Sequence, residues 1–244
     1  MKKLILAIVF LVLATALTIS NSTLLNGMTT IEIAHKLPIL LMPADFTFLI
    51  RPLIILFLAY WIIQFDSSDS VSTKRILLFI TACLANAVWF PLWNYGYFGW
   101  AFLLTAIGLL SLYVLYRTYP SKQNEWGQRI PISLLFSWTL IDFVMNANYL
   151  LVLDEWNRLG ISSVLWTIIN LTILTAIALH FSYHHRDRIF TAVFTWVFLG
   201  ILVNIRFEEL FVTLSTLFLI VIMIIGLYMF APSTPYDKTE ETSF

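Results

Sequence analysis

Long apolar runs separated by short polar connections dominate the hydrophobic pattern of this 244-residue chain. Eight of these runs approach the roughly 20 residues that an α-helix needs to cross the hydrocarbon core of a bilayer. All are too long, and too uniformly apolar, for the alternating strands of a membrane β-barrel. They cover approximately residues 4–20, 47–65, 75–96, 99–118, 130–152, 161–181, 189–205 and 209–231. The pattern therefore predicts an all-α, polytopic membrane bundle of about eight transmembrane helices.

Composition supports this class and narrows the choice of partners. Hydrophobic residues make up 60% of the chain and charged residues 11%, whereas a soluble domain is about half apolar and about a quarter charged. The formal net charge of zero gives no indication of a nucleic-acid partner. The single cysteine, Cys83, excludes disulfides within the chain and zinc sites with two or more thiolates. We expect the lipid bilayer and a hydrophobic small molecule as partners, and allow for a homodimer.

The distribution of Lys and Arg predicts the orientation in a cell membrane. With a cytoplasmic N-terminus, ten of these residues fall on the inner side and four on the outer side. The positive-inside rule then places both termini in the cytoplasm. The first run follows Lys2 and Lys3 and could also be a signal peptide, but residues 17–20 lack a clean small-residue cleavage site. We therefore expect an uncleaved first helix.

The third apolar run carries a polar and aromatic stripe. Asn86, Trp89 and Trp93 fall on one face of a helix with 3.6 residues per turn. Pro91 removes a backbone donor and predicts a bend near Ala87. An aromatic wall with an amide suits a flat, mostly apolar ligand. Polar residues in membrane helices also join helices without binding any ligand, so both interpretations stay open.

The fifth run carries a second stripe, formed by Trp138, Asp142, Asn146 and Tyr149. A carboxylate near the middle of a span costs roughly 2.5–3.5 kcal/mol on insertion scales unless it is paired or protonated. Asp142 is therefore either a ligand-cavity or proton-linked acid, or a partner in an interhelical contact. Arg51, about one turn into the second run, is its candidate partner if the second and fifth spans touch.

Two further features leave alternatives open. In the long outer connection, Pro38 and Pro43 bracket an apolar piece over residues 39–42, which predicts either a rigid flap over the bundle or an ordinary surface loop. His180 and His184 have a spacing that can bind a metal or haem. No third ligand is evident in the sequence, so a basic interfacial cluster is the favoured interpretation and no metal site is predicted.

Three ordered motifs resemble the TspO/MBR family, the tryptophan-rich sensory proteins and translocator proteins. They are the N-x-x-W-x-P run of the third span, a tryptophan eight residues before an asparagine in the fifth, and P-x-x-aromatic-x-F at the entry to the second. The matching residues are Asn86, Trp89 and Pro91, then Trp138 and Asn146, then Pro43, Phe46 and Phe48. This resemblance implies a TspO-like five-helix membrane core over residues 1–152. Residues 153–231 would form a three-helix membrane extension, followed by a polar tail over 232–244.

The resemblance also implies a function. Family members bind tetrapyrroles, so we expect a membrane binding or sensory protein for a tetrapyrrole or a similar flat hydrophobic ligand. Porphyrin or haem would be a ligand here rather than an established cofactor, and no catalytic residue is predicted. The 21–46 connection would act as a lid over a cavity that opens outward. The residues expected to line this cavity are Asn86, Trp89, Trp93, Trp138, Asp142, Asn146, Phe46 and Phe48.

Two departures from the family pattern suggest other classes of function. Arg51 and Pro52 stand where the family tends to have a tryptophan, and Asp142 replaces a small or hydroxyl residue. The main alternative is a small proton-linked membrane transporter with Asp142 as the coupling carboxylate. A partner subunit without a ligand is a third, and its interior would contain only packed Trp and Asn contacts.

Overall fold

The computed structural model describes residues 2–22, 27–119 and 126–229. Within these ranges, eight helices are long and apolar enough to cross a membrane, and no strand occurs. The all-α membrane fold and the predicted number of spans are therefore confirmed. The long helices are α1 (Lys2–Ser22), α3 (Ile50–Gln64), α4 (Ser72–Asn94), α5 (Phe98–Arg117), α6 (Arg129–Leu153), α7 (Ser163–His184), α8 (Arg188–Ile205) and α9 (Leu210–Met229). The polar tail predicted over 232–244 lies outside the described residues.

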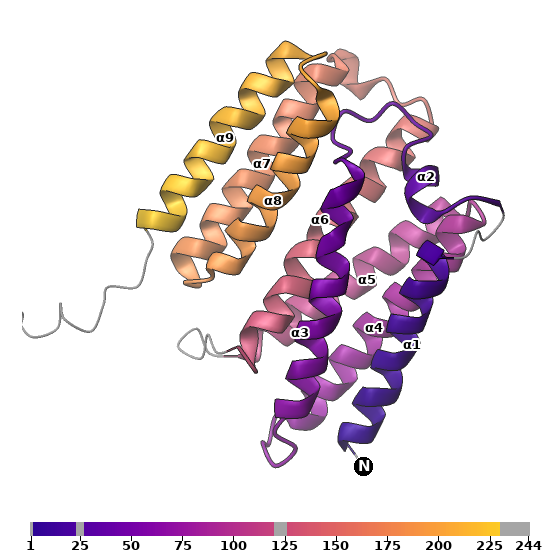
Figure 1. The fold of residues 1–244 in the computed structure, drawn as a ribbon, viewed down its shortest axis with the longest axis vertical. Helices are drawn as coiled ribbons and strands as arrows, with labels where there is room; N and C mark the ends of the chain where they lie inside the picture. Colours follow the sequence, from indigo (N-terminus) through magenta and orange to yellow (C-terminus); the bar gives the residue numbers. More distant parts are fainter. Residues whose placement is uncertain (1, 23–26, 120–125, 230–244) are drawn as a thin grey trace, which may run out of the picture.

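The long helices form two groups that meet at α6. In the first group, α4 packs against α1 and α5, α5 packs against α6, and α3 contacts α1 and α6 (Figure 1). In the second, α7, α8 and α9 pack on one another, and α8 contacts α6. The proposed division into a core over 1–152 and an extension over 153–231 follows this grouping. It stays a prediction, because direct packing of α6 on α8 joins the two groups.

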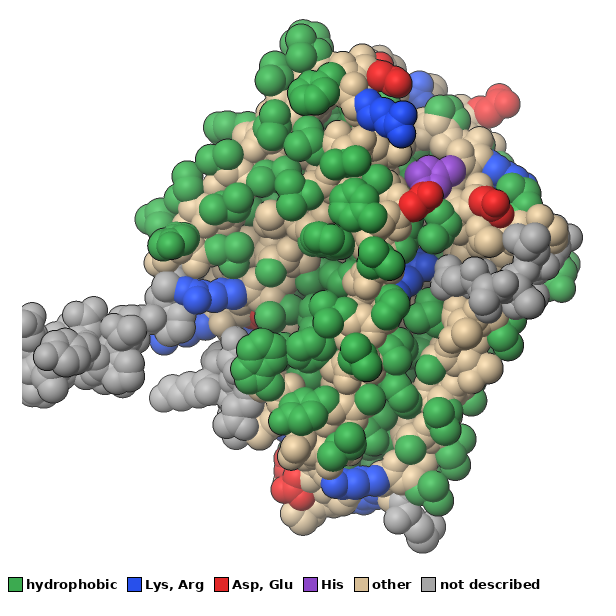
Figure 2. All heavy atoms as spheres, viewed as in Figure 1, with side chains coloured by type: hydrophobic (Ala, Val, Ile, Leu, Met, Phe, Trp, Pro, Cys, Tyr) green, Lys and Arg blue, Asp and Glu red, His purple; other side chains and the backbone are tan. Residues whose placement is uncertain are grey.

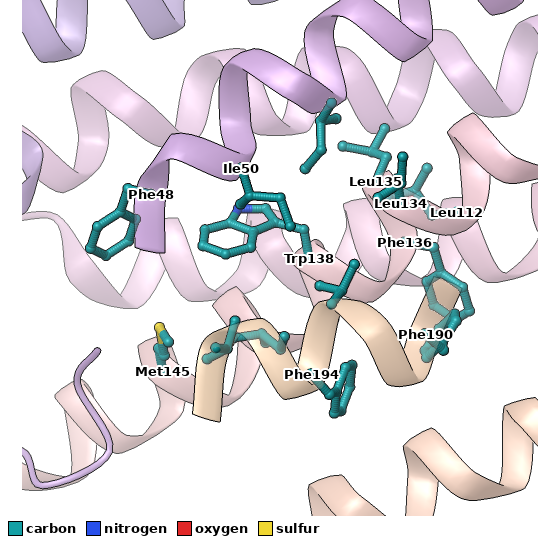
Figure 3. Packing of buried hydrophobic residues seen from close by; sticks show 14 of the residues in the cluster. Phe48, Ile50, Leu112, Leu134, Leu135, Phe136, Trp138, Met145, Phe190 and Phe194 are labelled. Atoms are coloured by element: carbon teal, nitrogen blue, oxygen red, sulfur yellow. The ribbon is translucent and has the colours of Figure 1, made fainter. Parts of the chain in front are cut away.

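Helix α6 is the most deeply buried of the long helices, with 72% of its most apolar window buried. On one side its Trp138 meets Phe48, just before the start of α3, with ring centroids 5.9 Å apart (Figure 3). Nearer the N-terminus of the same helix, the ring of Phe136 contacts that of Phe190 of α8, with centroids 5.0 Å apart. These aromatic contacts extend one continuous core from the five-helix group to the extension.

Short helices lie in two of the connections between the long helices. Helix α2 (Thr30–Ala34) begins with a capping box, in which Thr29 and Glu32 satisfy each other's backbone N–H groups. A 3-10 helix, η2 (Asp45–Leu49), leads directly into α3, and a second, η3 (Arg158–Gly160), lies between α6 and α7. Helix α4 continues through Pro91 to Asn94 without interruption.

A buried ionic cluster joins the C-terminal end of α5 to the N-terminal ends of α6 and α8. Arg129 of α6 lies with its Nη2 atom 3.8 Å from Oδ2 of Asp187, which precedes α8. The Ser133 hydroxyl donates to the same carboxylate oxygen at 2.6 Å. Arg129 also donates to the Tyr116 hydroxyl and to the backbone carbonyl of His185. Because charges buried in this way need partners, this cluster fixes the extension against the core.

The surface agrees with a position in a bilayer. Hydrophobic side chains cover the face shown in Figure 2, while most of the charged side chains gather toward the ends of the helices. Exposed large apolar residues occur along every long helix except α6, where Leu153 stands alone at the helix end. The protein is thus a multi-pass membrane protein by its helices, and the cytoplasmic placement of its termini stays a prediction.

Candidate functional site

The polar and aromatic stripe of α4 faces the stripe of α6. The rings of Trp89 and Trp93 are stacked, with centroids 5.2 Å apart and an interplanar angle of 20°. The Trp89 indole Nε1 donates to the Asn146 side-chain oxygen at 3.1 Å, and the Trp93 ring contacts Tyr149 at 4.7 Å. Asn146 in turn donates to the backbone carbonyl of Asp142 at 2.6 Å. Helical spacing placed these side chains on two faces, and packing of the helices brings the faces together.

Arg51 and Asp142 meet at the centre of this region. The Arg51 Nη2 atom lies 3.8 Å from Asp142 Oδ1, so the pairing of the second and fifth spans inferred from the sequence is present. Three aromatic rings surround the guanidinium, those of Phe48 at 4.8 Å, Trp138 at 5.5 Å and Phe90 at 5.8 Å. These rings hold the cation through their negative faces.

The arginine nevertheless keeps unused hydrogen-bonding capacity. Its Nη1 atom is buried and has no hydrogen-bond partner among the described residues. At 3.8 Å, the Asp142 contact is longer than a hydrogen bond. A buried donor without a partner is uncommon in native proteins, and water or a ligand usually satisfies it. The arrangement can therefore accept an oxygen atom at Nη1.

Helix α2 covers the end of the stripe at Trp93, next to the C-terminus of α4. Trp93 Nε1 donates to the Thr30 carbonyl at 3.3 Å, and Asn94 Nδ2 donates to the Thr30 hydroxyl at 2.9 Å. The Tyr149 hydroxyl donates to the Ile33 carbonyl at 3.2 Å. A piece of the outer connection thus lies over the bundle. The sequence suggested residues 39–42 as that piece, whereas the hydrogen-bonded cover is α2 at residues 30–34.

Three cavities adjoin this cluster, and they differ greatly in size. Two interior cavities, of about 40 and 30 Å³, lie among the tryptophans and are both lined by Arg51, Trp89 and Asp142. A third cavity of about 610 Å³ lies between α1 and α3. Among the described residues, only Arg51 lines all three. The guanidinium therefore stands between the large cavity and the aromatic interior.

Not all the residues predicted to bind a ligand come together. Six of them surround the interior cavities: Phe48, Trp89, Trp93, Trp138, Asp142 and Asn146. Asn86 also lines one interior cavity, but its amide donates to the Ala82 carbonyl of its own helix at 2.9 Å. Phe46 lies apart, because its ring contacts Trp196 of α8 at 5.4 Å.

Other residues reach the site without a signal in the sequence. Leu13 and Leu17 of α1 line the interior cavity beside Trp138, and Ala14 lines the large cavity. These apolar residues look like ordinary lipid-facing positions, since α1 has no polar stripe. Asn94 also reaches the site, through its hydrogen bond to Thr30. The stripe did not include it, because a residue five positions after Trp89 lies on a different face of the helix.

Two histidines of α7 lie side by side near its C-terminal end. His180 and His184 lie with ring centroids 4.5 Å apart. Among the described residues, no group of three or more His, Cys, Asp or Glu side chains is placed to hold a metal ion.

Nearly the whole chain matches a known protein family. A family model described as "TSPO-like protein" matches residues 3–229. The match begins in α1 and ends at the last residue of α9, so it includes the extension as well as the five-helix group. No curated protein and no solved structure matches the chain.

Proposed function

This chain belongs to the TSPO-like protein family, and from that premise we propose that it is a membrane binding or sensory protein for a tetrapyrrole or a similar flat hydrophobic ligand. The observation that carries this proposal is the stacked pair Trp89 and Trp93 beneath α2. Flat ligands gain from stacking on such rings. Asn146, whose amide already orients the Trp89 indole, offers polar contacts to the edge of a ligand.

Ligand entry requires α2 to move. Typical small-molecule pockets have volumes of about 300–1,000 Å³, and the two interior cavities hold about 40 and 30 Å³. Helix α2 has five residues, and its hydrogen bonds to Trp93, Asn94 and Tyr149 close the outer end of the aromatic stripe. Breaking these bonds uncovers the tryptophan faces. We therefore propose that α2 is the lid through which the flat ligand enters.

A fluorescence titration with protoporphyrin IX tests the proposal. Detergent-solubilised protein is titrated while Trp emission is followed, and saturable quenching at micromolar ligand is expected. Trp138→Phe and Trp89→Phe should each weaken binding by about two- to tenfold, the range for one aromatic contact. Trp100→Phe is the matched control, because Trp100 is 66% exposed on α5. Linear quenching without saturation, or an equal effect of all three variants, would reject a tetrapyrrole site among these rings.

The second candidate function is proton-linked transport, which the Arg51–Asp142 pair favours. A carboxylate that lies within a span beside an arginine and two cavities is placed to exchange a proton with a substrate-bound state. The test is uptake of protoporphyrin IX into proteoliposomes with and without a proton gradient. Gradient-driven uptake that Asp142→Asn abolishes would favour transport. Binding without gradient-driven uptake would favour the binding protein.

A further inference from the structure

The cavity between α1 and α3 is a lateral groove, and the tetrapyrrole proposal does not use it. The groove has a volume of about 610 Å³, within the range of small-molecule sites. Its walls come from α1, α3 and η2, with Ile31 added from α2, and are mostly apolar, with Ala14, Leu17 and Ile55 among them. Leu49 and Leu56 at its rim are each 68% exposed, so the groove opens through the side of the bundle. This side faces the viewer in Figure 2, where hydrophobic side chains line both helices.

A single buried cation stands at the inner wall of the groove. Arg51 is 8% exposed, and its Nη1 atom has no hydrogen-bond partner among the described residues. Asp142 lies behind it, 3.8 Å away on the side of the interior cavities, and does not line the groove. The guanidinium presents a planar fork of N–H donors, which fits the two oxygens of a carboxylate. An apolar groove that ends at such a fork has the chemistry of a site for an anionic amphiphile.

The charge of the groove selects among anionic head groups. Asp45 also lines the groove, near its outer end, and its Oδ1 atom lies 3.0 Å from Nε2 of His35. Asp142 already offsets part of the Arg51 charge. A head group with one negative charge therefore meets less repulsion than a phosphate with nearly two. This difference favours a carboxylate over a phosphate monoester, and a competition experiment separates a carboxylate from a singly charged phosphodiester.

We propose that the groove between α1 and α3 binds a free fatty acid, whose carboxylate pairs with Arg51 and whose acyl chain lies along Ala14, Leu17 and Ile55. The ligand enters sideways from the hydrocarbon core of the bilayer. Its entry needs no movement of α2. The fatty-acid site is thus a different cavity from the tetrapyrrole site, and the two share part of their walls. The shared residues are Leu17, Ile31, Phe48, Arg51 and Ile55.

Binding of tritiated oleate to the full-length protein in detergent tests this site. Unlabelled oleate should compete, and methyl oleate should compete at least about tenfold less well, because it lacks the charge that pairs with Arg51. Arg51→Gln should weaken oleate binding by about tenfold or more, with little change for methyl oleate. Arg51→Lys keeps the charge but loses the fork, and should give a smaller loss. Equal competition by both compounds, or unchanged oleate binding in Arg51→Gln, would overturn the proposal.

Filling the groove provides a test that leaves the arginine intact. Ala14→Phe places a ring among the groove walls, whereas Thr15→Phe places the same ring on an exposed position of α1. Only Ala14→Phe should abolish oleate binding. Its protoporphyrin IX titration should stay unchanged, because Ala14 lines neither interior cavity, so failure of one proposal is distinguishable from failure of the other. Oleate binding that survives in Ala14→Phe would place the fatty acid elsewhere.

A competition series separates a free fatty acid from a membrane lipid. Dioleoylphosphatidylglycerol and oleoyl lysophosphatidate are added as unlabelled competitors of tritiated oleate. The proposal expects oleate to be the strongest of the three. Stronger competition by either phospholipid would overturn the choice of a fatty acid and assign the groove to a lipid head group.

Discussion

Arg51 and Asp142 form an ion pair between α3 and α6, with Nη2 and Oδ1 separated by 3.8 Å. Their side chains are only 9% and 16% exposed, so each charge offsets part of the cost of burying the other. Both residues line the interior cavities, and Arg51 also lines the lateral groove. The same pair therefore contributes to helix packing and to the walls of both proposed sites.

A double-mutant cycle measures the coupling within this pair. Asp142→Asn and Arg51→Gln should each destabilise the protein, since each leaves the other charge buried without its partner. The double variant should be more stable than the sum of the two losses by about 0.5–3 kcal/mol, the range for residues in contact. Unfolding in a mixed-detergent series supplies the free energies. Arg206→Gln, at an exposed position after α8, serves as the uncoupled control. Additive losses for Arg51 and Asp142 would show that the pair contributes no coupling.

The Trp89–Asn146 hydrogen bond makes a second prediction. Asn146→Ala leaves the buried indole N–H of Trp89 without its acceptor, which should cost about 1–3 kcal/mol. Trp89→Phe removes that donor. It should therefore lower the free energy of unfolding by less in the Asn146→Ala background than in the unmodified protein. The free energy of unfolding of the four proteins tests this. An equal cost of Trp89→Phe in both backgrounds would contradict the predicted link between α4 and α6.

The two stripes show why part of the site could be predicted from the sequence. Residues four apart share a helix face whatever surrounds the helix, so Trp89 and Trp93 on α4, and Asp142 and Asn146 on α6, were identified from spacing alone. The capping box of Thr29 and Glu32 is likewise local, because a T-x-x-E pattern at the start of a helix lets the two side chains cap it whatever surrounds it.

Other contacts depend on how helices cross, which spacing does not determine. The approach of α1 to α3 creates the lateral groove, and nothing distinguishes Ala14 from a lipid-facing residue in the sequence. The pairing of Arg129 with Asp187 joins positions far apart in the chain, and each alone reads as an interfacial charge. Phe46 was predicted to line the same cavity, but its ring lies against Trp196 of α8, a contact that the spacing of residues does not determine.

A tight contact between α8 and the chain around η2 gives a third prediction. A Cβ atom at Gly200 of α8 would overlap the Thr47 hydroxyl and stand 3.0 Å from Pro43 Cβ, while the Ala44 N–H donates to the Gly200 carbonyl. Gly200→Ala should therefore push η2 away from α8 and destabilise the protein by about 1–3 kcal/mol. Gly99→Ala is the matched control, because nothing lies within 4 Å of its added Cβ. Thermal unfolding compares the two, and an equal effect would rule out the steric cause. Thr47→Ala should recover part of the loss in Gly200→Ala.

The capping box of α2 predicts a pH-dependent lid. Hydrogen bonds from the Thr29 backbone N–H and hydroxyl hold the pKa of Glu32 below its usual value. Because the folded pKa is lowered, this contribution to α2 is complete above the unfolded pKa of roughly 4.3. It is lost as the pH falls through the lower, folded value.

Hydrogen–deuterium exchange measures the opening of α2 directly. The exchange rate of the α2 amides in Glu32→Gln is divided by the rate of the same amides in the unmodified protein at the same pH, so that the intrinsic pH dependence of exchange cancels. This ratio should be highest near neutral pH and should approach one in acid. Glu155→Gln, an exposed carboxylate on the connection after α6, is the control and should give no change in this peptide. A ratio for Glu32→Gln that stays constant with pH would exclude the carboxylate as the cause.

The inner ionic cluster makes the last prediction, because Asp187 combines two roles in one side chain. Its Oδ1 accepts from the Ile189 N–H at the start of α8, and its Oδ2 accepts from Ser133 at 2.6 Å and lies 3.8 Å from Arg129. Asp187→Ala removes all three contacts and leaves Arg129 buried without its counter-charge, so a loss of about 3–5 kcal/mol is expected. Asp187→Asn keeps an acceptor for the helix cap and should lose less. Ser162→Ala, which removes the simple cap of α7, should cost about 0.5–2 kcal/mol and isolates the capping contribution. If Asp187→Ala cost no more than Ser162→Ala in the same unfolding assay, Asp187 would act as a cap alone, and the buried charge pair would not hold the extension to the core.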